Sequence, residues 1–308
     1  MADILEDKVA IVTGAGRGVG RGVAMLMASE GAKVVVVDPG VNVDGTGLDT
    51  SLADQVVKEI TDAGGAAVPC YESVVTMEGG ENIVKTAVDS FGKLDIVVTC
   101  AGILRDRMIF NMTEQEWDDV IAVHLKGTFT VVKHACILFR QQRSGRVITF
   151  TSQSGLYGNS GQANYGAAKS GIAGLTKVVA RDMGRYGVTA NAIAPRANTR
   201  MIANIPDSAS EIRARGGVAT LSGEVERDSW DPDAIAPFVA FLASDYADNV
   251  NGQTFEVYSG NVSLVSQPRP QRSIFNPEGQ WPVDKLALQA REFLTNGIHN
   301  PAPAQPPR

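Results

Sequence analysis

The sequence predicts a single doubly wound α/β domain, with a parallel sheet of about seven strands, followed by a C-terminal extension. Two patterns support this fold class. Short runs of apolar, β-branched residues alternate with stretches of helical periodicity, as in parallel strands joined by helices. The first run, Lys8 to Thr13, leads into the glycine-rich segment TGAGRGVG, then a helical stretch, then a second run that ends at Asp38. Strand, glycine-rich turn, helix and strand in this order predict a βαβ unit.

The remaining elements follow the same alternation. Further strands are expected at residues 32–38, 66–70, 94–99, 145–151, 188–194 and 254–258, and helices at 20–30, 51–63, 79–91 and from 113 to about 140. Thr113 and Glu116 form a capping box at the start of the last of these helices. Asp231 and Pro232 predict the start of another helix that runs through Ala243. We expect residues 1–265 to form the domain.

Composition limits the classes of partner. The chain has 308 residues, is 44% hydrophobic and carries a net charge of -6. The negative charge argues against nucleic acid or an anionic membrane surface as the main partner, and no apolar run approaches the ~20 residues of a membrane span. The segment MADILEDKVAIVTG lacks the basic region of a secretory signal. Three scattered cysteines fit reduced thiols, so a cytoplasmic protein is expected. The three histidines form no HxxxH or HExxH pair and CxxC is absent, so no metal site is predicted.

The glycine-rich segment predicts a dinucleotide site. Closely spaced glycines let backbone N–H groups approach a pyrophosphate at a helix N-terminus. Asp38, at the end of the next strand, is placed to accept hydrogen bonds from a ribose diol and to repel a 2′-phosphate, which favours NAD over NADP. Arg17 favours NADP instead, because a cation in the loop could pair with that phosphate. The strand-end carboxylate is given more weight, and NAD is the predicted cofactor.

Tyr165 and Lys169 are spaced to act together. Residues four apart share one face of a helix, so the phenol and the ammonium can reach one site. A nearby cation favours phenolate and is expected to lower the tyrosine pKa from about 10. Ser152, thirteen residues before the tyrosine, follows a predicted strand and can hydrogen-bond a reacting oxygen. The Tyr-x-x-x-Lys pair alone is a weak signal, because chance pairs on solvated helices are common.

Taken together, TGAGRGVG, Asp38, Ser152, Tyr165 and Lys169 resemble the short-chain dehydrogenase/reductase family over about residues 7 to 262. A narrower resemblance, in AGILRDR, VHLKGTF, SGLYGNSGQANYGAAK and NAIAPRANTRM, is to the hydroxyacyl-CoA dehydrogenase part of multifunctional enzyme type 2, also called 17β-hydroxysteroid dehydrogenase type 4. The resemblance implies a Rossmann fold, a nicotinamide cofactor and an assembly of two or four identical chains.

The resemblance also implies a role for each matching residue. Tyr165 is the general base toward an alcohol, Lys169 lowers its pKa and binds the nicotinamide ribose, and Ser152 orients the substrate oxygen. The cofactor site implied by the resemblance comprises Gly14, Arg17, Gly18, Val19, Gly20, Asp38, Ser73, Val74, Ala101, Gly102, Tyr165, Lys169, Pro195 and Thr199.

Three departures from the family pattern stand out. The usual Asn-Asn-Ala-Gly after the fourth strand reads Thr-Cys-Ala-Gly here, ending at Gly102. His124 stands where the family has a helical asparagine that kinks the helix and holds a water through its backbone carbonyl; we include His124 among the catalytic residues, with a part in proton relay as a hypothesis. The usual Pro-Gly after the sixth strand is Pro195-Arg196.

The predicted reaction is reversible hydride transfer between NAD and a secondary alcohol. A 3-hydroxyacyl-CoA is the predicted substrate, through the narrower resemblance, with a fatty or steroid-derived acyl part. The candidate partners of its phosphates are Arg196, Arg200, Arg213 and Arg215, although ordinary surface ion pairing is the more common role for any single one of them. The alternative enzyme acts on a free hydroxysteroid or another secondary alcohol, and a third possibility is an NAD-binding regulator without turnover.

The extension at residues 266–308 is rich in proline and contains one amphipathic stretch, Val283 to Leu294. A helix there is expected either to pack on its own domain or to cover a neighbouring subunit or the substrate mouth. The last residues, PAPAQPPR, read as extended or disordered.

Overall fold

A computed structural model describes residues 3–197 and 231–301 of the chain. The described residues fall into two compact units, one of residues 3–197 and 231–265, the other of residues 266–301. Thr199, Arg200, Arg213 and Arg215 lie outside the described residues, so the predictions made for them stay predictions.

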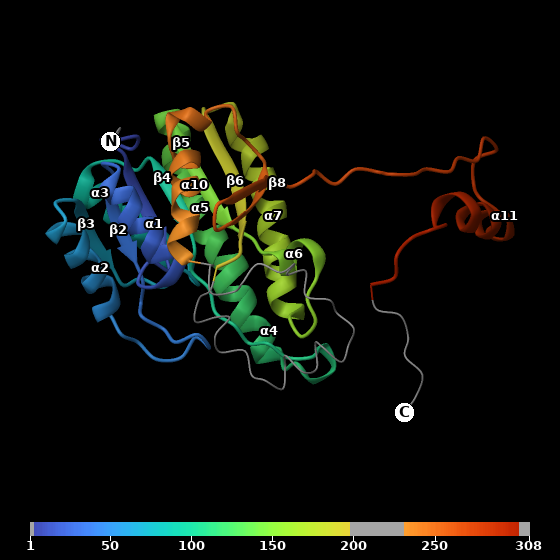
Figure 1. Ribbon diagram of the computed structural model, residues 1–308, viewed down its shortest axis with the longest axis horizontal. Helices are drawn as coiled ribbons and strands as arrows, with labels where there is room; N and C mark the ends of the chain where they lie inside the picture. Colours follow the sequence, from blue (N-terminus) through green and yellow to red (C-terminus); the bar gives the residue numbers. More distant parts are fainter. Residues whose placement is uncertain (1–2, 198–230, 302–308) are drawn as a thin grey trace. The chain divides into compact units, whose positions relative to one another are not determined.

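The first unit is built on one eight-stranded sheet in the order β3-β2-β1-β4-β5-β6-β7-β8 (Figure 1). The strands are β1 (Val9–Thr13), β2 (Lys33–Val37), β3 (Ala66–Cys70), β4 (Ile96–Thr99), β5 (Gly145–Phe150), β6 (Val188–Pro195), β7 (Thr254–Tyr258) and β8 (Asn261–Leu264). All neighbouring pairs are parallel except β7 and β8. The chain crosses from β3 over β2 and β1 to β4, and the carboxyl ends of β1 and β4 meet where this order reverses. Such a switch point is where open α/β sheets bind ligands.

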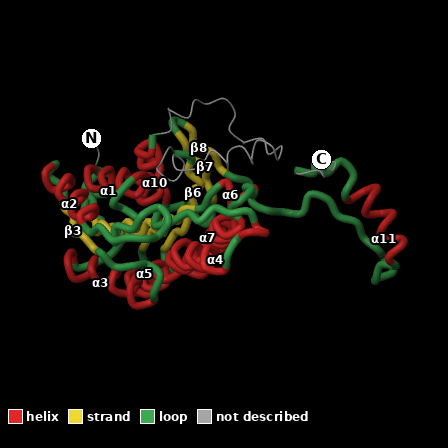
Figure 2. The backbone as a smooth tube through the Cα atoms, turned by 90° about the horizontal axis from the view of Figure 1, so that it is seen from below, coloured by secondary structure: helices red, strands yellow, loops and turns green. Residues whose placement is uncertain are grey.

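Helices cover both faces of the sheet (Figure 2). One face carries α1 (Gly18–Ser29), α2 (Ser51–Asp62) and α10 (Ala236–Ala243); the other carries α3 (Met77–Phe91), α5 (Gly127–Gln142) and α7 (Ala163–Gly184). Because both faces are covered, the central strands are apolar on every side; all five residues of β1 are buried. The doubly wound α/β prediction is therefore confirmed.

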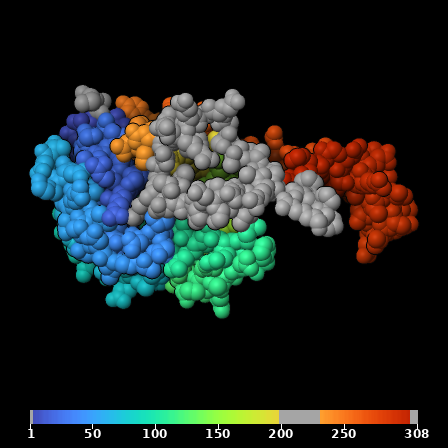
Figure 3. All heavy atoms as spheres, turned by 60° about the horizontal axis from the view of Figure 1, so that its bottom comes forward, coloured from blue at the N-terminus to red at the C-terminus, as the bar shows by residue number. Residues whose placement is uncertain are grey.

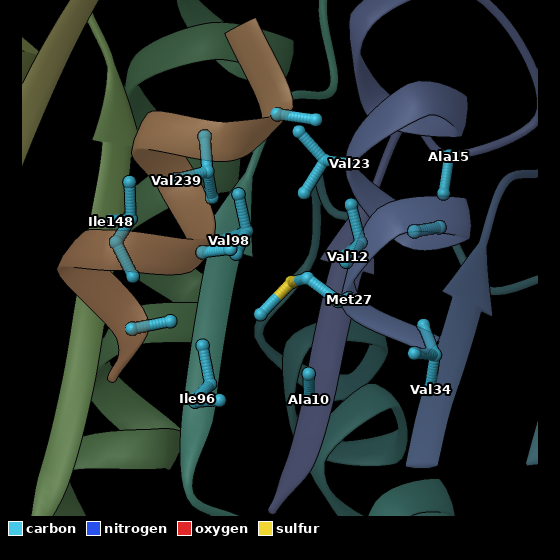
Figure 4. Close-up of a cluster of buried hydrophobic side chains, with 14 of the residues drawn as sticks. Ala10, Val12, Ala15, Val23, Met27, Val34, Ile96, Val98, Ile148 and Val239 are labelled. Carbon is cyan, nitrogen blue, oxygen red and sulfur yellow. The ribbon is translucent and has the colours of Figure 1, made fainter. Parts of the chain in front are cut away.

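The core on the α1 side shows how the layers join. Val12 of β1 and Val98 of β4 meet Val23 and Met27 of α1, with Val239 of α10 closing the cluster (Figure 4). Each side chain of this kind contributes about 1.5–3 kcal/mol when it is fully removed from water. The sheet edge that carries the site is thus held by packing on both sides.

Two elements differ from the prediction. The sheet has an eighth strand, β8, which turns back antiparallel after Ser259, a residue in the left-handed region with φ 46°. A short run at an exposed edge has too few buried positions to give a sequence pattern. A second unpredicted element is the five-residue helix α6 (Gln153–Tyr157), none of whose residues is buried.

The long helix predicted from Thr113 exists but is interrupted. It consists of α4 (Glu114–Ile121), the π-helical turn η2 (Ala122–Lys126) and α5, with the predicted capping box of Thr113 and Glu116 formed at its start. By length and composition this is the one helix among the described residues that could cross a membrane, but 44% of its apolar window is buried inside the protein. A core helix of a globular domain passes the same test.

The second unit contains the helix expected in the extension. It consists of α11 (Val283–Gln289) and the π-helical turn η6 (Ala290–Leu294). The Arg272 guanidinium donates to the carbonyl of Asn296, 2.5 Å away, and so ties the segment before the helix to the segment after it.

Candidate active site

The glycine-rich segment forms a turn between β1 and α1 that admits only glycine at its key points. Gly14 and Gly18 lie in the left-handed region, with φ of 66° and 54°. A Cβ on Gly14 would lie 2.8 Å from the backbone of Ala101, and one on Gly20 would lie 2.2 Å from the carbonyl of Gly14. Arg17 is the exposed N-cap of α1 and makes no side-chain cap. The first N–H groups of α1 are therefore not capped by the Arg17 side chain, which leaves them for an anion such as a pyrophosphate.

Asp38 is bound to the loops on both sides of it. Its Oδ2 accepts from the N–H of Gly16 at 2.8 Å, and its Oδ1 accepts from the N–H of Gly40 at 2.8 Å. A carboxylate has about four acceptor positions, two on each oxygen. One position on each oxygen therefore remains for a further donor, and two remaining acceptors match the two hydroxyls of a ribose diol.

The carboxyl end of β4 lies beside the glycine turn. The Ala101 N–H donates to the hydroxyl of Thr13 at 3.2 Å. Gly102 packs against the imidazole of His124, since a Cβ on Gly102 would come within 2.3 Å of that ring. The glycine at the end of the Thr-Cys-Ala-Gly motif therefore leaves room for the imidazole of His124. On the far side of the site, Val74 is buried and its carbonyl accepts from the hydroxyl of Thr130 at 2.6 Å.

Ser152 and Tyr165 are brought together as predicted. Ser152 follows β5 and caps α6, and its Oγ accepts from the N–H of Ser154 at 3.2 Å. Tyr165 lies in the first turn of α7, and its phenol interacts with the Ser152 hydroxyl. Burial raises the pKa of Tyr165 to about 12; the interaction with Ser152 acts to lower it, and the charge of Asp106 raises it.

Lys169 lies one turn further along α7 and is buried. Its ammonium donates to the carbonyl of Phe150 at 2.7 Å and lies 5.6 Å from the centre of the Tyr165 ring. Burial lowers the pKa of Lys169 to about 8. The expected lowering of the tyrosine pKa by this cation is therefore not what the structure shows, because the ammonium bonds a backbone carbonyl and the desolvation of the phenol is the larger effect.

His124 lies in the π-helical turn η2 and contacts the same tyrosine. The two rings meet edge to face, with centroids 5.1 Å apart. Its Nε2 lies 2.8 Å from the carbonyl of Ile103, and its Nδ1 has no partner among the described residues. Burial lowers the pKa of His124 to about 3, with the Lys169 charge acting in the same direction. A neutral imidazole with these contacts holds the chain after β4 in place; the proton-relay hypothesis stays a hypothesis.

The other predicted residues surround this centre. Pro195 ends β6, Val19 packs partly into the core beneath the glycine turn, and Ser73 follows β3 on the surface. Among residues 3–197 and 231–301, no group of three metal-binding side chains is present. The glycine turn, Asp38 and Ser152 thus follow the carboxyl ends of β1, β2 and β5, at one end of the sheet.

Comparison with known proteins agrees with this combination. Residues 8–209 match the family described as short chain dehydrogenase. The chain belongs to the short-chain dehydrogenase family. As a member, it is an oxidoreductase that acts on CH–OH groups with a nicotinamide dinucleotide.

Three relatives show how far the likeness of this short-chain dehydrogenase extends. It is 40% identical over 299 residues to hydroxyacyl-CoA dehydrogenase ChsB1 of Mycobacterium tuberculosis, covering 94% of this chain and 89% of that protein. It is 39% identical over 275 residues to peroxisomal multifunctional enzyme type 2 of Mus musculus, covering 89% of this chain and 35% of that longer protein. The crystal structure of a short chain dehydrogenase from Mycobacterium avium matches with a TM-score of 0.80 at 38% identity, covering 99% of this chain and 98% of that one.

The residues that position Tyr165 in this dehydrogenase were not predicted from the sequence. Asn164 is fully buried, and its Oδ1 accepts from the N–H of Tyr165 at 2.7 Å while its amide donates to the carbonyls of Arg105 and Glu116. Gln162 donates to Asp106 at 2.8 Å. A single asparagine beside a tyrosine carries no periodic signal, so only the fold reveals that it joins α7 to α4 and to the loop after β4.

The loop after β2 lies against that same segment. The N–H of Leu104 donates to the carbonyl of Val43 at 2.8 Å, and Gly45 contacts the side chain of Ile103. Figure 3 shows the two regions as neighbouring blue and green surfaces. The long glycine-rich connection of this dehydrogenase is thus packed against the loop that precedes α4.

Arg196 forms an ion pair, the alternative to the phosphate contact considered for it. Its guanidinium lies 3.4 Å from the carboxylate of Glu256 and stacks on the ring of Tyr258 at 4.7 Å. An arginine held by a carboxylate is poorly placed to bind a substrate phosphate. Of the four arginines proposed for that purpose, the one within the described residues is therefore engaged inside the domain.

Proposed function

We propose that this short-chain dehydrogenase oxidises a 3-hydroxyacyl-CoA with NAD, in fatty-acid or steroid side-chain oxidation. The observation that carries the proposal is the placement of Ser152 and Lys169 beside Tyr165, in a chain that is 40% identical to a protein named hydroxyacyl-CoA dehydrogenase over nearly its whole length. The name of that relative, ChsB1, supplies the substrate class.

The residues divide the chemistry among them. The bound nicotinamide supplies the hydride acceptor. Ser152 holds the substrate oxygen, and Tyr165 exchanges a proton with it. Since burial keeps the pKa of the phenol near 12, the protonated form suits ketone reduction at neutral pH, in which Tyr165 donates. Alcohol oxidation needs the phenolate, so its rate should rise as pH increases above neutrality.

The substrate prediction is tested with NADH formation at pH 9 and NADH consumption at pH 7. The oxidative assays use (3R)- and (3S)-3-hydroxyacyl-CoA and a hydroxysteroid without CoA; the reductive assays use the matching ketones. We expect turnover of one CoA stereoisomer, with oxidation favoured at the higher pH. Activity on the free steroid alone would support the alternative dehydrogenase. NADH binding without turnover of any substrate would support a regulator.

The preference for NAD is supported by Asp38. Its remaining acceptors suit the two donors of a ribose diol, whereas a 2′-phosphate offers negative charge. Arg17 lies exposed at the start of α1, and its positive charge would favour the 2′-phosphate of NADP.

Asp38→Ala is expected to reduce the preference for NAD over NADP by about 10- to 100-fold, because hydrogen bonds to a charged group contribute about 1.5–3 kcal/mol. The ratio of kcat/KM for the two cofactors measures this. Asp44→Ala, on the same exposed loop, is the control and should leave the ratio unchanged. An equal ratio in Asp38→Ala and the wild-type chain would show that another group selects the cofactor.

A homodimer or homotetramer in the cytoplasm is also proposed. Phe129 and Ile137 lie eight residues apart on α5 and are 44% and 51% exposed, and Val178 on α7 is 54% exposed. Exposed apolar side chains repeated along helices often mark an interface. The three cysteines are free, which suits a reducing compartment. A monomer mass by light scattering, or recovery of the protein outside the cytoplasm, would contradict these proposals.

A further inference from the structure

The helix α6, which Ser152 caps, packs against α7 without a fully buried side chain. Its residues 153–156 are half-buried and Tyr157 is exposed, so apolar burial alone holds its first turn only in part. Polar contacts add to that packing. On one side Ser154 donates to Gln162 at 2.7 Å, and Gly155 lies directly on the backbone of Lys169, with no space for a Cβ.

On the other side the contact comes from Arg196. Gln153 follows Ser152 directly, and its amide oxygen accepts from both Nε and Nη2 of that guanidinium in the orientation that satisfies both side chains. Two donors on one acceptor define direction as well as distance.

The guanidinium is itself held rigidly. Its charge is paired with Glu256 of β7 and its plane stacks on Tyr258, while the Arg196 N–H donates to the carbonyl of Val257 at 2.9 Å. The side chains of Arg196 and Glu256 are only 17% and 12% exposed. Burial raises the pKa of Tyr157, at the other end of α6, and the Glu256 carboxylate raises it further. Glu256 therefore acts near both ends of α6.

We propose that Arg196 is a positioning residue for the catalytic serine: with Glu256 it fixes Gln153, and thereby holds Ser152 against Tyr165. This role differs from a phosphate-binding role, in which the guanidinium would face solvent rather than Glu256.

Arg196→Met tests this, because it keeps the aliphatic stem but removes the charge and the donors. We expect kcat to fall about 10- to 100-fold, as a small displacement of a catalytic group costs, while KM for the cofactor and NADH affinity by fluorescence stay within about twofold. Gln153→Ala should give a similar fall. The double variant should be no slower than the slower single variant, because both changes remove one contact. Gln153→Glu keeps an acceptor and should retain most of kcat.

Arg146→Met is the matched control. Arg146 is 12% exposed and pairs with Asp245 at 3.3 Å, at the opposite end of the sheet. It should lose thermal stability without losing kcat. The inference is overturned if Arg196→Met, like Arg146→Met, keeps its kcat. It is also overturned if the fold-losses of kcat in Arg196→Met and Gln153→Ala multiply in the variant that carries both. This inference rests on the proposed dehydrogenase activity only because kcat is what is measured. Each variant is compared with the wild-type chain on a secondary alcohol that the wild type oxidises. If the substrate proposal is wrong, the wild type fails to turn over the 3-hydroxyacyl-CoA; if the inference about Arg196 is wrong, the wild type is active and only the variants differ from expectation.

Discussion

Tyr165→Phe is expected to lower kcat by about 10³- to 10⁴-fold, because the phenol is the group placed to exchange a proton with the substrate oxygen. The ring itself should stay in place, since its contacts with His124 and Lys169 involve the aromatic ring and not the hydroxyl. NADH titration by fluorescence should therefore give nearly the wild-type affinity, while steady-state turnover is lost.

Tyr186→Phe is the control for this substitution. Tyr186 follows the other end of α7, where three arginines surround its ring, so the same chemical change is made far from the site. It should leave kcat unchanged. If Tyr165→Phe kept more than a tenth of the wild-type rate, another group would have to be the proton donor and acceptor.

The second large effect concerns acid stability and arises from His124. The folded chain holds this imidazole at a pKa of about 3, whereas an unfolded chain would show about 6.5. The unfolded state therefore binds a proton that the folded state does not bind between these values. The free energy of unfolding is therefore not reduced by this group above pH 6.5, and it decreases steadily as the pH falls from 6.5 toward 3. The slope is at most about 1.4 kcal/mol per pH unit, so lowering pH from 6.5 to 5 should cost about 2 kcal/mol.

His124→Asn removes this titration while keeping a polar side chain of the kind the family has there. Urea unfolding at pH 7 and pH 5 should show a smaller loss of unfolding free energy in the variant than in the wild-type chain, by about 2 kcal/mol. His134→Asn, which changes a histidine with less burial and a smaller downward pKa shift, should reduce the loss much less. Equal losses in wild type and His124→Asn would mean that the imidazole takes up a proton over the same pH range in the folded and unfolded chains.

Much of the fold could be predicted from local patterns. A buried parallel strand needs a continuous apolar run, and a helix needs a capping signal and a period near 3.6, so β1, β2 and the start of α4 could be placed to within two residues. The elements that were not predicted are those whose sequences lack an apolar run or a helical period. The helix α6 is one turn long with no buried side, and β8 pairs at an exposed edge.

The candidate site divides in the same way. Tyr165 and Lys169 carry their spacing in the sequence, and Asp38 is marked by the strand that it ends. Asn164 and Arg196 act through contacts with residues that are 48 and 60 positions away, which no local pattern reveals. The direction of the Tyr165 pKa shift also depended on the fold, because whether the cation or the desolvation dominates is decided by where Lys169 donates its hydrogen bond.

The π-helical turn at His124 keeps two halves of a helix in phase. The buried positions Val120, His124 and Thr128 repeat every four residues, a spacing that drifts by about 40° per step in an α-helix. A π-helical turn takes in one extra residue and nearly cancels that drift. Loss of any one residue from 122–126 would restore the ordinary ladder and rotate α4 by about 100° relative to α5. Val120 would then leave its cluster with Ile103 and Ala168. This stretch should therefore accept substitutions far more readily than a change in length.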